Sequence, residues 1–185
     1  MADVDDGFAE RLKRKLAPES VGAALIRAGA LLTGYELVKM SILDGVRGFF
    51  LTGFDIDEGL KHSPSYARTV LPLGTNPFEA SVAWLVQNDA LTQSQAEAFD
   101  SIRDHRHEVA HELARLLVDP DADVDVEHLR ALHGIMRSLD QFWGSIEVDI
   151  NPDFLGAEVD RDTIRSGSGA LLEYLVHLAG LNEPV

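Results

Sequence analysis

Hydrophobic residues recur at helical spacing along most of the chain, in segments separated by proline, glycine and polar turns. The longest such segment covers about residues 19–50, where apolar side chains repeat every three or four positions and define one stripe. The stripe consists of Val21, Ala24, Ala28, Leu31, Tyr35, Val38, Ile42, Val46 and Phe49. Glycines within this segment weaken it as an isolated helix, so we expect packing to hold it and its small residues to admit another helix closely.

Shorter periodic segments lie on both sides of this long one. A short amphipathic helix over residues 8–16 should end at Ala17, because Pro18 disfavours the helical conformation of the residue before it. Further helices are expected at about residues 76–88, 93–118, 126–146 and 170–181.

Two tetrapeptides mark helix starts. Asn76-Pro77-Phe78-Glu79 combines a capping asparagine, a proline at the first helical position and a glutamate whose side chain should reach back to the Asn76 amide. Thr92-Gln93-Ser94-Gln95 repeats the capping pattern. We therefore expect both helices to begin at well-defined residues.

The remaining segments have no sustained period. Residues 51–75 are expected to form a long irregular connection, and residues 151–168 a turn-rich one that leads into a flexible helix start. Without a convincing alternating strand or an internal repeat, the pattern predicts one all-α domain over residues 1–185. We expect an antiparallel helical bundle over 19–181, preceded by an N-terminal arm over 1–18.

Composition restricts the class of protein further. The chain has no cysteine, which excludes disulfides and thiolate metal sites. Its start lacks the apolar core of a secretory signal, and no apolar run appears long enough to cross a bilayer. We therefore expect a cytoplasmic protein with no membrane partner.

Charge limits the range of partners. With 16 Lys and Arg against 31 Asp and Glu, the formal net charge is −15, so the chain as a whole repels a polyanion. Any nucleic-acid role must rest on a local basic site. Two groups of basic residues stand out, of which the first is typical of a solvated helix face: Arg11, Lys13, Arg14 and Lys15, and Arg103, Arg106 and Arg115.

The helix over residues 101–117 carries the candidate chemistry, since it contains three histidines and three arginines. Helical spacing places Arg106 near the middle of an apolar face formed by Phe99, Ile102, Val109, Leu113, Leu116 and Leu117. A charge on the core side is costly unless it is paired, so Arg106 must meet a carboxylate, a subunit boundary or a bound anion.

Two reaction types fit the neighbouring residues. Arg103, His107 and His111 share one flank of the helix, and an arginine fork beside an imidazole suits phosphoryl transfer. Alternatively, His107-Glu108-Val109-Ala110-His111 matches the zinc-hydrolase pattern, with two imidazoles one turn apart and a glutamate as base. Against zinc, the flanks are charged, no supporting sheet is expected, and no third ligand is evident, although Glu127, Glu147 and Glu158 are available.

The segment Arg106-His107-Glu108-Val109-Ala110-His111 resembles the Arg-x(4–6)-His motif of the HEPN superfamily, in which the residue after the arginine is typically Asn, Asp or His. The capped helix, the short turn and the long helix over 76–118 resemble that family too. The resemblance implies an α-helical bundle that dimerises with two motifs facing each other. Such proteins are commonly metal-independent endoribonucleases of toxin–antitoxin, abortive-infection or other phage-defence systems, and some are non-catalytic interaction modules.

On this resemblance, each motif residue has an expected role. Arg106 would hold the scissile phosphate of an RNA, and His111 would act as general base or acid on the ribose 2′-hydroxyl or the leaving oxygen. His107 would orient Arg106 or the phosphate, Arg103 would add charge, and Glu36 is a candidate partner of Arg106. No metal or cofactor is expected.

The expected partners are RNA at this local site, a second copy of the chain, and an antitoxin or regulatory protein. Two alternatives stay open. The net charge of −15 favours a non-catalytic interaction or ligand-binding module of the same family, and the His107–His111 spacing allows a zinc-dependent hydrolase.

Overall fold

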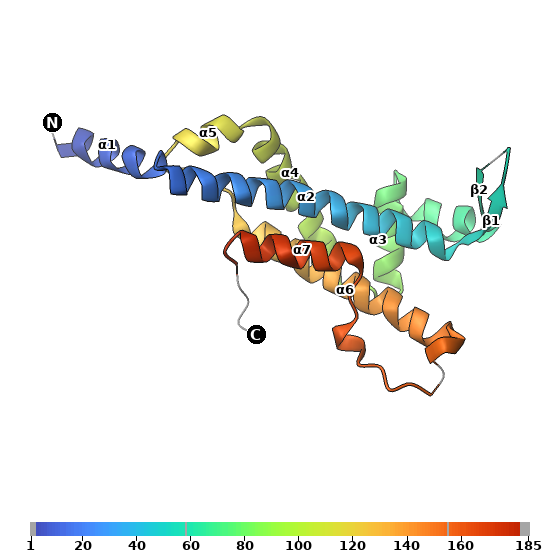
Figure 1. Cartoon of the computed structure of the whole chain (residues 1–185). Helices are drawn as coiled ribbons and strands as arrows, with labels where there is room; N and C mark the ends of the chain where they lie inside the picture. Colours follow the sequence, from blue (N-terminus) through green and yellow to red (C-terminus); the bar gives the residue numbers. More distant parts are fainter. Residues whose placement is uncertain (1–2, 58, 155, 182–185) are drawn as a thin grey trace.

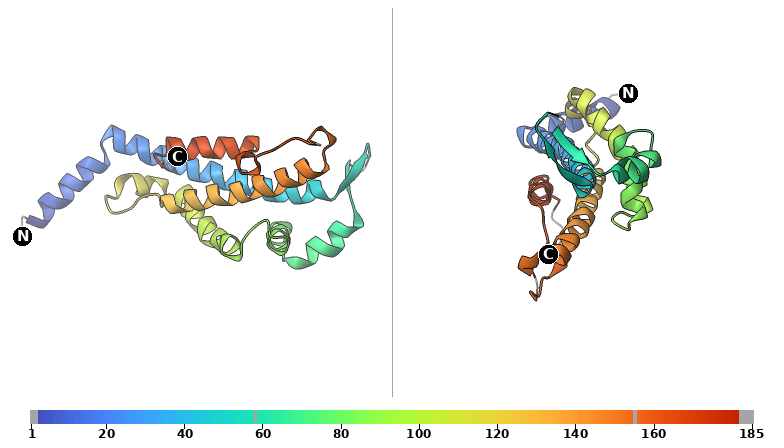
Figure 2. Two further views of the ribbon diagram at one scale, coloured as in Figure 1. Left: turned by 90° about the horizontal axis from the view of Figure 1, so that it is seen from below. Right: turned by 90° about the vertical axis from the view of Figure 1, so that its right-hand side faces the viewer.

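A computed structural model describes residues 3–57, 59–154 and 156–181. Helices dominate it, which confirms the predicted all-α character (Figure 1). The α-helices are α1 (Asp3–Lys15), α2 (Pro18–Phe49), α3 (Pro77–Gln87), α4 (Gln93–His111), α5 (Leu113–Val118), α6 (Val126–Ile150) and α7 (Gly167–Leu178). Seen along the long axis, α3 and α4 lie on one side of the molecule and α7 on the other (Figure 2).

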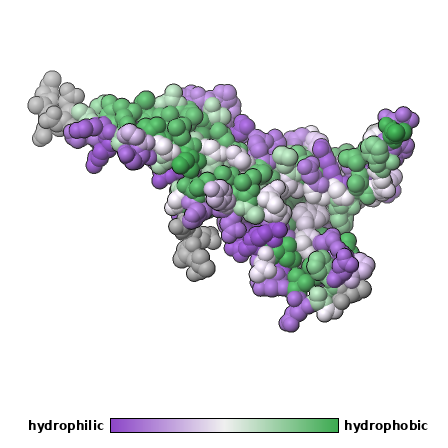
Figure 3. Space-filling model, viewed as in Figure 1, coloured by the Kyte–Doolittle hydropathy of each residue, from purple (hydrophilic) through white to green (hydrophobic). Residues whose placement is uncertain are grey.

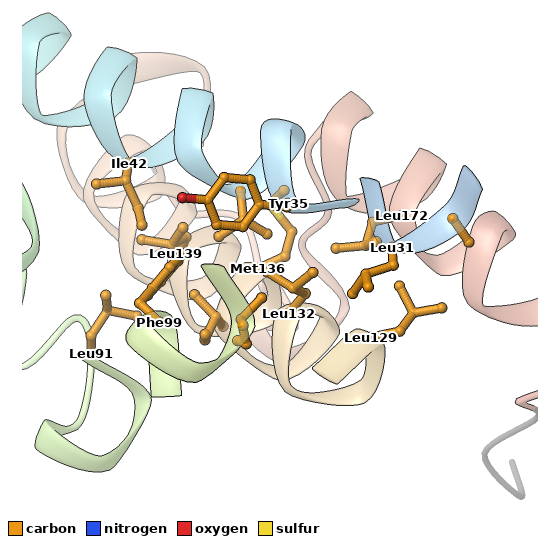
Figure 4. Packing of buried hydrophobic residues seen from close by; sticks show 14 of the residues in the cluster. Leu31, Tyr35, Ile42, Leu91, Phe99, Leu129, Leu132, Met136, Leu139 and Leu172 are labelled. Carbon is orange, nitrogen blue, oxygen red and sulfur yellow. The ribbon is translucent and has the colours of Figure 1, made fainter. Parts of the chain in front are cut away.

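Helix α2 is the axis on which the other helices pack. The middle of its predicted stripe, from Ala24 to Val46, is buried, while Phe49 at its end is 52% exposed. Leu31, Tyr35 and Ile42 meet the apolar side chains of α6, among them Leu132, Met136 and Leu139 (Figure 4).

Two glycines of α2 let neighbouring helices approach, as predicted. A Cβ at Gly34 would overlap the side chain of Leu172, and a Cβ at Gly45 would overlap the indole of Trp143. These positions therefore exclude larger side chains.

The same contacts define the relative direction of α2 and α6, which differs from the antiparallel arrangement expected from the sequence. Gly34 lies against Leu129 near the start of α6, and Gly45 against Trp143 further along it, so α2 and α6 run parallel (Figure 2). Helix α7 is antiparallel to both α2 and α6. The reason is the long path between α2 and α6: it returns the chain to the start of α2, where Asp123 pairs with Arg27.

The two predicted helix starts are present, with one change of partner. Asn76 accepts hydrogen bonds from the backbone N–H groups of Phe78 and Glu79, and Thr92 and Gln95 form a complete capping box. The carboxylate of Glu79, however, accepts from the backbone N–H and the hydroxyl of Thr75, the residue before the cap. Hydrogen bonds from the Thr75 side chain and backbone lower the pKa of Glu79.

The connection after α2 is more regular than expected. It contains an antiparallel hairpin of β1 (Leu51–Asp55) and β2 (Gly59–His62), then a π-helical turn at Tyr66–Val70 and a 3-10 turn at Leu71–Leu73. The prediction of an irregular segment without strands was wrong here. Both faces of the hairpin are largely exposed, so its sequence has no apolar and polar alternation to reveal it.

Helix ends also differ from the sequence expectation. The predicted single helix to residue 118 is divided, because Glu112 leaves helical geometry with φ −111° and ψ 19°, and α5 begins after it. Helix α6 continues to Ile150, beyond the expected 146. Helix α7 begins at Gly167 because the Ser166 side chain caps it by accepting from the Gly169 N–H.

Helix α2 is also apolar enough, by length and composition alone, to cross a bilayer, contrary to the expectation from the apolar runs. Its most apolar window has a mean hydropathy of 1.3, and 39% of that window is buried inside the fold. The buried residues are those that form the core stripe. A core helix of a folded domain satisfies the same measures.

Candidate functional site

Arg106 lies where α4 crosses α2, at the rim of the core. Its Nη2 donates to Oε1 of Glu36 at 2.9 Å, so the proposed pairing with Glu36 is present. The guanidinium carbon lies 5.7 Å from the centroid of the Tyr35 ring. With a side chain 33% exposed, Arg106 meets both the apolar interface and solvent.

The arginine retains unused hydrogen-bonding capacity. Its Nε is buried and has no hydrogen-bond partner among the described residues. A guanidinium offers five N–H donors in a planar fork, and the described contacts use one nitrogen of the three. Arg106 can therefore donate to an oxyanion through its remaining N–H groups while Glu36 still holds it.

His107 and His111 occupy the last turn of α4, with ring centroids 4.3 Å apart. Both residues are exposed. Neither has a hydrogen bond or ion pair with another described residue. Two adjacent imidazoles open to solvent can serve as proton acceptor and proton donor.

Arg103 stands one turn before His107 and is neutralised on its own helix. Its guanidinium lies 3.1 Å from the Asp100 carboxylate and 3.6 Å from that of Asp104. It also borders a groove of about 560 Å³ between α2, α3 and α4. The groove has apolar walls that include Phe78 and Phe99, and a rim with Lys39 and Glu79.

Tyr35 connects this groove to Arg106, since it lines the groove and also lies under the guanidinium. Burial raises the pKa of its phenol above the ordinary value of 10.0, and the Glu36 carboxylate adds to the effect. The positive charges of Arg103 and Arg106 oppose it. The phenol is therefore a neutral hydroxyl throughout the physiological range.

The zinc-hydrolase interpretation requires a free Glu108, and this carboxylate is engaged elsewhere. Arg115 donates to Glu108 at 2.6 Å, and Nδ1 of His105 lies 3.1 Å from its other oxygen. Within residues 3–57, 59–154 and 156–181 no group of three histidine or carboxylate side chains is placed to hold a metal ion. The described residues thus offer His107 and His111 no third ligand.

His105 has a structural role that the sequence did not reveal. Its Nε2 accepts a hydrogen bond from the Asp125 backbone N–H at 2.9 Å, and its ring stacks on that of His128 at 4.9 Å. It thereby ties α4 to the start of α6. Its spacing of three residues from Glu108 is the one signal that could have separated it from His107 and His111.

Two further polar groups on α6 were also missed. His133 is only 9% exposed. Asp140 is 6% exposed, and its Oδ2 has no hydrogen-bond partner among the described residues. A Cβ on Gly169 would overlap the Asp140 carboxylate, so this acid lies against the first turn of α7, where the helix dipole favours negative charge.

Comparison with known proteins assigns no family to this arrangement: no family model matches the chain, and neither a curated protein nor a solved structure does. Function must therefore be argued from the site itself.

Proposed function

We propose that the chain is an HEPN-like, metal-independent endoribonuclease that works as a homodimer in a toxin–antitoxin or phage-defence system. One observation carries the proposal. Arg106 is held at the rim of the α2–α4 interface by Glu36, on the same helix as two exposed imidazoles, His107 and His111, that have no hydrogen bond or ion pair within the described part of the chain. Cleavage of RNA by its own 2′-hydroxyl needs an anion-binding cation and a group that moves protons, and this helix supplies both.

The proposed reaction uses these groups in one displacement. Arg106 binds the non-bridging oxygens of the scissile phosphate, and His111 takes the proton of the ribose 2′-hydroxyl. The 2′-oxygen attacks phosphorus, the bond from phosphorus to the 5′-oxygen breaks, and that oxygen leaves with a proton from the protonated imidazole of His107. The products are a 2′,3′-cyclic phosphate and a 5′-hydroxyl. His107 orients the phosphate, and Arg103 contributes positive charge to the approach.

A homodimer is supported by the outer face of α2. Gly22, Ile26, Gly29, Thr33, Glu36 and Met40 follow each other at alternating spacings of four and three residues, away from the core. A Cβ at Gly22 or Gly29 would meet nothing within 4 Å. Hydrophobic residues gather along this part of α2 and on α7 (Figure 3). Apart from Glu36 this face carries no charged side chain, which suits association of two chains that each carry a net charge of −15.

The same face of α2 connects the proposed dimer to the Arg106 site. Glu36 belongs to it by helical spacing, and Glu36 holds Arg106. Two copies joined through this face would each contribute an Arg106–Glu36 pair close to the shared boundary. An isologous contact places the same residues on both sides of the two-fold axis, as facing motifs require.

The test is cleavage of a labelled RNA by purified protein with a chelator present. We expect wild-type protein to cut, and Arg106→Ala and His111→Ala to lose activity by about a hundredfold or more. Matched controls are Arg130→Ala, whose arginine pairs with Glu127 on the surface of α6, and His177→Ala, an exposed histidine of α7. Equal cleavage by wild-type protein and all four variants would contradict the proposal.

A second candidate is the non-catalytic interaction module. The neutralising partners favour it, because Glu36 pairs with Arg106, and Asp100 and Asp104 pair with Arg103. In that case wild-type protein would leave RNA intact, whereas Arg106→Ala would still alter dimerisation. The same set of variants therefore separates the two candidates.

A further inference from the structure

A second basic site lies at the opposite end of the fold from the hairpin. It is a pocket of about 370 Å³ between α1, the start of α2 and the segment that follows α5. Its polar lining consists of Arg11, Arg14, Lys15, Ser20, Arg27 and Asp123. On α1 the three basic residues have helical spacing of three and four, so they share one face.

The cations of this pocket exceed the carboxylates that face them. Arg27 is 3.4 Å from Asp123, and Arg11 is 3.5 Å from Asp121, both long contacts between exposed or half-exposed groups. Arg14 has no hydrogen bond or ion pair with any described residue. Four positive charges therefore meet two negative ones, in a chain whose overall charge is −15.

Two further donors are placed for an anion. The Nε of Arg27 is buried and lacks a hydrogen-bond partner within the described part of the chain. Ser20 stands in the first turn of α2, where the helix dipole favours negative charge. By contrast Lys15 donates to the Ala122 carbonyl, and Arg27 already lies 3.4 Å from Asp123. Arg14 is therefore the cation of the pocket that has no partner among the described residues.

Helix α5 and the segment after it connect the pocket to the site on α4. Helix α5 begins two residues after His111 and contacts both α1 and α2. The segment 119–125 then leads from α5 into the pocket. In Figure 1 α5 lies between α1 and the end of α4, in the half of the molecule away from the hairpin.

We infer that this pocket binds a phosphate group of the RNA backbone, on the nucleotides that flank the cleaved one. The inference rests on the proposed ribonuclease function. It also resolves the conflict between an RNA substrate and a strongly acidic chain. A polyanion gains affinity only where cations neutralise its phosphates, and this pocket is a local surplus of such cations outside the Arg106 site.

The test is RNA binding without turnover. A fluorescein-labelled 2′-O-methyl RNA cannot be cut through its 2′-oxygen, so fluorescence anisotropy reports affinity alone. We expect Arg14→Gln to weaken binding by about three- to tenfold and to lower the salt slope of log K by about 1. Arg27→Gln should act in the same direction. Arg130→Gln, which changes an arginine of α6 outside the pocket, should leave both values unchanged.

Thermal unfolding of each variant verifies that it is folded. Arg14, which has no partner among the described residues, provides the variant least able to disturb the fold. Equal affinity of Arg14→Gln and wild-type protein, or no RNA binding by wild-type protein, overturns the inference. Displacement of the RNA by inorganic phosphate at matched phosphate concentration overturns it as well, because the ligand is then a free phosphate. RNA binding that needs Arg14, in a protein that cuts no RNA, upholds the pocket and rejects the nuclease.

Discussion

Arg106 of α4 and Glu36 of α2 form an ion pair, 2.9 Å long, whose side chains are 33% and 45% exposed. A pair at the surface contributes between about 0 and 1 kcal/mol to the free energy of unfolding. Stability alone therefore does not account for a charge on the apolar face of α4. The pair instead holds a guanidinium at a boundary where an anion can reach it.

The first prediction separates this role from a structural one. Arg106→Leu should change the free energy of unfolding by less than about 1 kcal/mol, since leucine suits the apolar face and Glu36 stays hydrated. RNA cleavage should fall by about a hundredfold or more in the same variant. Urea denaturation followed by tryptophan fluorescence, together with cleavage rates, measures both. A large loss of stability would mean that Arg106 serves packing.

The second prediction concerns the junction of α6 and α7. Gly169→Ala should destabilise the protein by about 1–3 kcal/mol, because the new methyl group overlaps the buried Asp140 carboxylate. Gly167→Ala is the control: its methyl group meets nothing within 4 Å, and alanine favours the helix. Urea midpoints compare the two. If both variants match wild-type protein, Asp140 does not lie against α7.

The third prediction tests the outer face of α2. Ile26→Lys places a charge on a side chain that is 46% exposed on this face, and should convert a dimer into a monomer. Ile150→Lys makes the same change on a side chain 71% exposed at the end of α6, and should leave the dimer intact. Sedimentation velocity distinguishes these states. A wild-type monomer, or a dimer that survives Ile26→Lys, would contradict the proposed boundary.

The fourth prediction follows from the raised pKa of Tyr35. The folded state holds the phenolic proton more tightly than the unfolded state, so stability should fall as the pH rises past the ordinary value of 10.0. In Tyr35→Phe the decrease in stability with rising pH should be smaller than in wild-type protein. In Tyr174→Phe, which changes an exposed tyrosine, it should be the same. Urea midpoints from neutral pH to about pH 10.5 give the comparison. Identical slopes for all three proteins would show that Tyr35 titrates normally.

Two capping tetrapeptides predicted the helix starts at Asn76 and Thr92, and helical periodicity predicted the core of α2, because capping and burial depend on residues close in sequence. It did not predict the direction of α6. That direction depends on the length of chain between α2 and α6, and on contacts such as Gly45 with Trp143, which are remote in sequence. The hairpin was missed because its side chains are exposed on both faces.

The candidate site was predicted in part. The charge at Arg106 and its partner Glu36 could be found because a cation on an apolar face requires a carboxylate or an anion. The sequence could not show which histidines of α4 have a structural role and which face solvent. His105 is fixed by the Asp125 backbone and by His128, both on another helix, whereas His107 and His111 face solvent. Asp140 gave no signal either, because its neighbour Gly169 lies in a different segment.

The chemistry of the cut ends of an RNA tests the central claim most directly. RNA treated with wild-type protein and a chelator should yield fragments that end in a 2′,3′-cyclic phosphate and begin with a 5′-hydroxyl, as mass spectrometry can determine. His111→Ala should yield none above background. Fragments with 5′-phosphate ends, cleavage that persists when every ribose lacks its 2′-hydroxyl, or RNA left intact by wild-type protein would contradict the account.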